Sequence, residues 1–109
     1  MPETFEVVLT KRAQDEINQA HDWWADHRST EQANRWYLKF FEAMITLEKN
    51  PSRCQLAPEN DRFDYELRQL SFGVGSTPTH RAVFVIRDTT VLILRIRHLA
   101  QAPIAPPND

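Results

Sequence analysis

The chain of 109 residues has little cysteine, little glycine and no long apolar run. Cys54 is its only cysteine, which excludes a disulfide within the chain and is typical of a reducing compartment. No apolar segment approaches the length of a membrane span, so a transmembrane helix is excluded. Residues 1–12 lack the basic and apolar regions of a secretory signal, and we therefore expect a cytoplasmic protein with no membrane partner.

Several motifs of known enzyme classes are also missing. The sequence contains no GxGxxG, no GxxxxGK[ST] and no GxSxG, so nucleotide-binding loops and nucleophile elbows have no support. Its four histidines (His21, His27, His80 and His98) do not combine with cysteine at metal-ligand spacing, and we expect neither a metal nor a cofactor. Cys54 is interpreted as a bystander in a loop, with a catalytic thiol as the alternative.

Charge is low overall and unevenly spread. The net charge is −2, but residues 1–61 carry seven Lys or Arg against eleven Asp or Glu, whereas residues 62–109 carry six against four. All three lysines lie in the first half, so the second half is positive through arginine alone. Arginine suits bidentate contacts with phosphate or carboxylate, which indicates a binding face. A dedicated nucleic-acid-binding domain would be more basic.

The first half of the chain predicts one strand and two helices. Residues 4–9 are rich in β-branched residues, Thr10 is a suitable N-cap for the next helix, and a second helix begins at Ser29 or Thr30 and is stopped by Pro51. Acidic residues off the apolar stripe, Glu16 among them, are interpreted as a solvated face. The stripes are Ala13, Ile17, Ala20 and Trp24 in the first helix, and Ala33, Trp36, Phe40, Ala43 and Leu47 in the second. A further stripe of Tyr37, Phe41 and Met44 widens the second, which predicts a helical hairpin packed on a sheet.

The second half changes to a period of two. Residues 65–72, 80–87 and 91–98 are three strand candidates joined by short connections, which predicts an antiparallel meander. The expected fold is therefore α+β with the order β-α-α-β-β-β. In it, the helical hairpin packs on one face of a small antiparallel sheet and leaves the other face open. Residues 1–101 are expected to form one domain, and residues 102–109 a proline-rich tail that is mobile or laid over the surface.

Two groups of residues stand out as candidate sites. Arg68, Arg81 and Arg95 lie on neighbouring predicted strands and are expected to converge, whereas strand parity places His98 in the row of Leu92, Leu94 and Ile96, opposite Arg95 and Arg97. The alternative is that the arginines cover a polar sheet face and His98 ends a core row. Neighbouring helical residues diverge by about 100°, so Trp24 fits the core, and Trp23 is either packed under the tail or anchors a partner.

Taken together, these segments resemble the RelE/ParE superfamily of bacterial toxins, the toxic partners of type II toxin–antitoxin modules, often labelled plasmid stabilisation proteins. The resemblance covers about Phe5 to Gln101 and rests on the order and spacing of all its elements. The residues that carry it are VVLTKRAQDEI (7–17), Trp23–Trp24, Ala33, Phe40, Leu47, Asn50–Pro51, LRQL (67–70), HRAVFVI (80–86) and VLILRIRHLAQ (91–101).

The resemblance implies two kinds of activity. RelE-like members cut mRNA on the ribosome, ParE-like members poison DNA gyrase, and both are held inactive in a hetero-oligomer with a cognate antitoxin. Under the RelE-like interpretation, an endoribonuclease, Arg68 and Arg81 would hold the phosphate and His98 would act as acid or base. Under the ParE-like interpretation, the arginines, Arg95 and Arg97 included, form a binding surface.

Electrostatics favours the ParE-like interpretation. The chain is net acidic, has no lysine after Lys49, and carries His80 where the family usually has tyrosine. An enzyme that docks among rRNA phosphates needs more positive charge. A degenerate member that only binds its antitoxin is a third alternative. The antitoxin is expected to cover the apolar region near Trp23 and Trp36 and the open sheet face.

Overall fold

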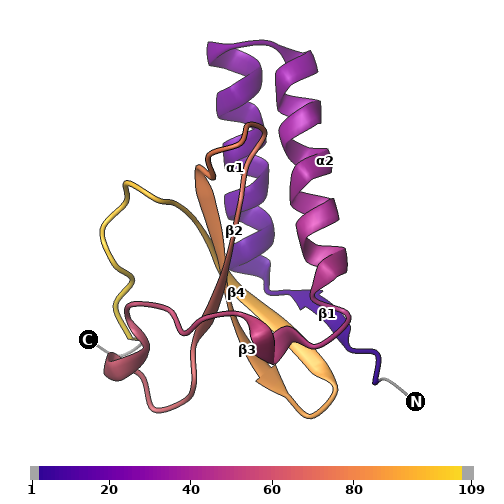
Figure 1. The fold of residues 1–109 in the computed structure, drawn as a ribbon. Helices are drawn as coiled ribbons and strands as arrows, with labels where there is room; N and C mark the ends of the chain where they lie inside the picture. Colours follow the sequence, from indigo (N-terminus) through magenta and orange to yellow (C-terminus); the bar gives the residue numbers. More distant parts are fainter. Residues whose placement is uncertain (1–2, 107–109) are drawn as a thin grey trace.

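The computed structural model describes residues 3–106 and confirms the predicted order of two helices inserted after the first of four strands (Figure 1). Two short 3-10 turns lie between the second helix and the second strand. The elements are β1 (Glu6–Leu9), α1 (Lys11–His27), α2 (Thr30–Thr46), η1 (Pro51–Arg53), η2 (Asn60–Arg62), β2 (Arg68–Phe72), β3 (His80–Arg87) and β4 (Thr90–His98).

The four strands form one sheet in the order β1-β4-β3-β2. Strands β2, β3 and β4 are antiparallel neighbours, as their short connections predict. Strand β1, however, runs parallel to β4, with Val7 opposite Val91. The sheet is therefore mixed, and the expectation of a wholly antiparallel sheet was wrong. No short connection joins β1 to β4, so hairpin geometry does not set their relative direction.

Side-chain caps and a stop signal set the bounds of both helices. The Thr10 hydroxyl accepts a hydrogen bond from the Ala13 N–H at 3.1 Å, and the Ser29 hydroxyl accepts one from Gln32 at 3.0 Å. Helix α2 ends at Thr46, four residues before the predicted end. The chain then forms a turn, Asn50 has a left-handed backbone conformation with φ 48°, and Pro51 begins η1. The hairpin lies along one side of the sheet (Figure 1).

The larger core lies between the helices and the sheet. Ile17 of α1, Trp36 and Phe40 of α2, and Phe84 and Ile93 of the sheet are at most 1% exposed and belong to one cluster. Trp24 is partly buried against this cluster, which confirms its predicted place on the core side of α1. Trp36 is wholly buried, so the structure places it in the core and not at a partner surface.

A β-bulge in β4 changes which of its side chains share a face. Val83 pairs with Arg95 but Phe84 pairs with Ile93, so Leu94 is an extra residue without its own partner. As a result, Val91, Ile93 and Ile96 face the helices, whereas Leu92 and Leu94 pack on the other side. The predicted row of Leu92, Leu94 and Ile96 was therefore wrong, because strict alternation does not survive the bulge.

The second face of the sheet is covered. Ala57 and Leu67 from the segment before β2, Val83 and Val85 from β3, and Ile104 from the tail form a second buried cluster. Figure 1 shows that segment and the yellow tail on the side of the sheet away from the helices. The expectation of an open face was wrong, since the chain itself supplies the cover. Tyr65 and Leu67 belong to this cover, so strand β2 begins at Arg68 and not at residue 65.

Among the described residues of the tail, Ile104 is the one that joins the buried cluster on this face. Ile104 is 4% exposed, and its N–H donates to the Glu59 carboxylate at 2.9 Å. Residues 107–109 of the expected tail lie outside the described residues.

Replacing Ile104 with alanine is expected to lower the free energy of unfolding by about 2 kcal/mol, the low end for a buried aliphatic residue, because a tail can partly close the gap. Urea denaturation would measure the loss. Leu99→Ala is the matched control, since Leu99 is 46% exposed and its loss is expected to cost less than about 0.5 kcal/mol. Equal effects of the two substitutions would contradict anchoring by Ile104.

Candidate functional site

A groove of about 570 Å³ runs between α1 and the adjoining ends of β3 and β4. Trp23 is its most exposed large apolar residue, at 48%, and its ring stacks on His27 with centroids 4.6 Å apart. Ala20 and Ile96 add apolar surface, and Arg28 adds positive charge. An exposed aromatic ring beside an apolar floor and a cation is typical of a protein-binding groove.

Two histidines form part of the groove wall. His80 and His98 are opposite one another in the β3–β4 ladder, with ring centroids 5.0 Å apart and edge to face. His80 also packs against Trp36 at 5.0 Å, so both rings lie on the helix side of the sheet. Burial, and then the neighbouring His98, lower the pKa of His80 to about 4. His80 is therefore a neutral structural ring near pH 7 and not a poised acid or base.

The depressed pKa of His80 predicts a loss of stability in mild acid. In the unfolded chain His80 is protonated below about pH 6.5, but in the folded protein only near pH 4. The free energy of unfolding is therefore highest above pH 6.5 and falls as the pH drops from 6.5 towards 4. Between pH 7 and pH 5 the free energy of unfolding is expected to fall by about 2 kcal/mol. In the control variant His80→Phe, this part of the pH dependence should disappear. An unchanged pH profile in that variant would contradict the assignment.

Arg81 lies on the opposite face of the sheet in a buried ion pair. Its guanidinium donates to both carboxylate oxygens of Glu59 and, at 2.9 Å, to Gln69. The two charged side chains are 8% and 1% exposed. Burial alone would raise the pKa of Glu59, but hydrogen bonds from Arg81 and from the Ile104 N–H, with the charge of Arg81, outweigh it and lower the pKa to about 2.

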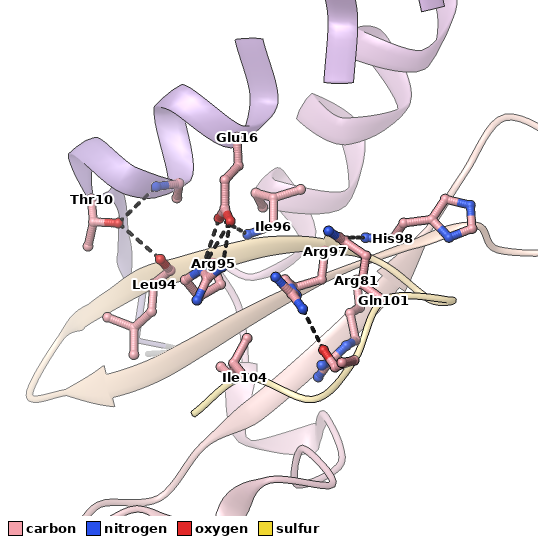
Figure 2. A network of polar contacts seen from close by, with 12 residues as sticks. Thr10, Glu16, Arg81, Leu94, Arg95, Ile96, Arg97, His98, Gln101 and Ile104 are labelled. Atoms are coloured by element: carbon pink, nitrogen blue, oxygen red, sulfur yellow. Dashed lines mark hydrogen bonds and ion pairs between the residues drawn. The ribbon is translucent and has the colours of Figure 1, made fainter. Parts of the chain in front are cut away.

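Arg95 is held by a second carboxylate. The Glu16 carboxylate, on α1, accepts hydrogen bonds from the Arg95 guanidinium at 2.8 and 3.0 Å (Figure 2). It also accepts a hydrogen bond from the backbone N–H of Ile96 at 2.8 Å. This contact covers the edge of β4 beyond the point where β1 ends. The interpretation of Glu16 as part of a solvated face was therefore wrong, because α1 crosses directly over that edge.

The remaining predicted residues have separate partners. Arg68 donates to Glu66 at 2.8 Å and to the Cys54 carbonyl at 2.5 Å, and the Arg97 guanidinium bonds to the Ala102 carbonyl of the tail. Arg97 and His98 lie on opposite faces of β4, as parity predicts. Burial raises the pKa of the Cys54 thiol, which disfavours the thiolate that a nucleophile needs.

The structure thus brings together only some of the predicted site residues. Trp23 and His98 share the groove, whereas Arg68, Arg81 and Arg95 do not converge but pair with three different carboxylates. Sequence reasoning missed Glu59, which lies in a polar loop without any pattern. Glu16 carried a usable signal, because it lies three residues after Ala13 and four before Ala20, at the border of the apolar stripe.

The described residues offer neither a metal site nor a membrane span. Within residues 3–106, no group of three or more His, Cys, Asp or Glu side chains is placed to hold a metal ion. No helix in the same range is long and apolar enough to cross a membrane.

The fold and groove define an α+β protein with a helical hairpin on a small mixed sheet. Residues 7–103 match the family described as "ParE toxin of type II toxin-antitoxin system, parDE". The chain belongs to this ParE toxin family, which confirms the resemblance to the RelE/ParE superfamily. No curated protein matches the chain significantly. A solved structure titled "Chromosomal ParDE TA system from P. aeruginosa" is similar, with a TM-score of 0.71, 17% identity, and coverage of 87% of this chain and 96% of that one.

Proposed function

We propose that the protein is the toxin of a type II toxin–antitoxin module, that it stops growth by binding a protein target such as DNA gyrase, and that a cognate antitoxin neutralises it. Membership of the ParE family over residues 7–103 is the observation that carries the proposal. The similar ParDE structure supports a hetero-oligomer with the antitoxin. A gyrase target places the protein in the cytoplasm.

The partners of the arginines favour binding over RNA cleavage. A RelE-like endoribonuclease would need Arg68, Arg81 and His98 around one phosphate, with Arg81 free to contact it. Arg81 instead faces the side of the sheet covered by the tail and is neutralised by Glu59, while His98 faces the helices. Cleavage would require the tail to leave and a buried ion pair to break, and that cost favours the ParE-like function.

The groove beside α1 is the proposed contact for the antitoxin. Trp23 offers an exposed ring, Ala20 and Ile96 an apolar floor, and Arg28 a cation that suits an acidic side chain of the partner. Of the other predicted binding residues, Trp36 is buried in the core, and Arg95 and Arg97 line a pocket on the side of the tail. The charge of Arg95 is also paired with Glu16. Of the predicted binding residues, Trp23 is therefore the one proposed to anchor the antitoxin.

Controlled expression in bacteria tests toxicity. Induction of the chain alone is expected to stop growth, and co-expression of the cognate antitoxin should restore growth. Continued growth on induction, with the folded protein present in the cells, would contradict the proposal. That outcome would favour a degenerate member that only binds its antitoxin.

A further inference from the structure

A second pocket, of about 580 Å³, lies on the other side of the sheet between β4, the start of α1 and the tail. Its wall includes Arg12 from α1, Arg95 and Arg97 from β4, and Phe63 and Tyr65 from the segment before β2. Figure 2 shows Leu94 and Ile104, two further wall residues, on the side of β4 where the tail runs. This volume is within the range of small-molecule sites in proteins, roughly 300–1,000 Å³.

The positive charge around this pocket is not fully neutralised. Arg95 is paired with Glu16, but within residues 3–106 no carboxylate pairs with Arg12 or Arg97. The Arg97 side chain bonds only to the Ala102 carbonyl, and its Nε is buried with no hydrogen-bond partner among the described residues. Arg97 therefore lines the pocket with a charge that no carboxylate of residues 3–106 pairs with, and an anion in the pocket would supply the missing countercharge.

The start of α1 adds to this positive potential. Helix N-termini favour negative charge, but the first turn of α1 contains no acidic residue and instead carries Lys11 and Arg12. Lys11 is paired with Asp15, whereas Arg12 lines the pocket. The helix terminus and the arginine on it therefore act in the same direction as Arg97.

The other walls are aromatic and apolar. Phe63 and Tyr65 have ring centroids 5.6 Å apart and are partly exposed, and Pro103 and Pro106 of the tail also line the pocket. Aromatic rings next to arginines are suited to a planar ring joined to a phosphate. The volume of about 580 Å³ suits a small molecule and not a nucleic-acid strand.

We propose that this pocket binds a nucleoside phosphate, with Arg12 and Arg97 at the phosphate and Phe63 and Tyr65 at the base. The site lies on the opposite face of the sheet from the groove proposed for the antitoxin. It does not depend on the proposed toxin function, and either proposal can fail without the other.

Isothermal titration of the purified full chain tests the site with three probes: ADP, pyrophosphate and adenosine. ADP is expected to bind more tightly than either of the other two. Arg12→Gln and Arg97→Gln should each weaken ADP binding roughly tenfold or more, since each removes a charge-assisted contact. Arg12 is exposed, so its variant is expected to fold even if the Arg97 variant does not.

Arg35→Gln is the matched control, because Arg35 is an exposed arginine of α2 that does not line the pocket. It is expected to leave ADP affinity within twofold of the parent. Absence of ADP binding at millimolar concentration, or equal weakening in the Arg35 and Arg12 variants, would overturn the site. Equal affinity for ADP and pyrophosphate would overturn the nucleoside part and leave a pocket for phosphate alone.

Discussion

Replacing Arg81 with methionine is expected to lower the free energy of unfolding by about 3–5 kcal/mol, because it leaves the Glu59 carboxylate buried without its countercharge. Glu59 is 2% exposed, and two of its hydrogen-bond donors are nitrogens of Arg81. The Ile104 N–H would remain as a donor, but the tail would then be attached to an uncompensated charge. Chemical denaturation at pH 7 would measure the loss.

The double variant Arg81→Met, Glu59→Leu is the control for this prediction. Removing both charges leaves no buried ion, so the double variant is expected to regain most of the stability lost by Arg81→Met alone. A single variant as stable as the parent protein would contradict the assignment of Arg81 as a structural residue. It would then be free for the phosphate role that the RelE-like alternative gives it.

Replacing Trp23 with alanine is expected to weaken antitoxin binding by at least about 2 kcal/mol, or roughly 30-fold, because an exposed tryptophan beside an apolar floor is the kind of residue that dominates an interface. The stability of the toxin alone should change little, since the Trp23 ring is about half exposed. Isothermal titration with the cognate antitoxin would measure the affinity.

Leu38→Ala provides the comparison for the antitoxin measurement. Leu38 is an apolar residue of α2 that is 63% exposed and does not line the groove. Its loss is expected to change antitoxin affinity by less than about threefold, well under 1 kcal/mol. A strong effect of Leu38→Ala together with a weak effect of Trp23→Ala would place the antitoxin on α2 and contradict the proposed groove.

Local signals in the sequence predicted most of the element order. Thr10 and Ser29 cap the helices as expected, and Trp24 lies on the core side. Period-two segments gave β3 and β4 to within one residue. The turn between them works without glycine because Asp88 adopts φ 53°, a left-handed conformation that aspartate tolerates better than most residues.

The errors concern contacts between distant segments. The cover over the second sheet face depends on Ile104, one aliphatic residue in a proline-rich tail, meeting Leu67 and Val83. No periodic pattern in the sequence predicts this contact. The Glu59–Arg81 pair joins residues 22 positions apart through a loop with no pattern, so Arg81 looked like a free ligand for phosphate.

Trp36 and the β4 row failed for a different reason. A wide apolar arc on α2 does not reveal which of its sides is covered, and Trp36 proved to be wholly buried. In β4, the extra residue at the bulge puts Ile96 on the helix side, whereas Leu92 and Leu94 lie on the other face. Alternation along the sequence cannot reveal this bulge, because β4 has apolar residues on both faces and fits the pattern with or without the extra residue.

A supercoiling assay with purified DNA gyrase tests whether the protein inhibits a protein target without cleaving RNA. We expect the toxin to inhibit supercoiling, the antitoxin to relieve the inhibition, and His98→Ala to leave it unchanged. Unaffected gyrase would contradict the proposed function, above all if the same preparation cut mRNA at codon-registered positions during cell-free translation and His98→Ala abolished the cuts.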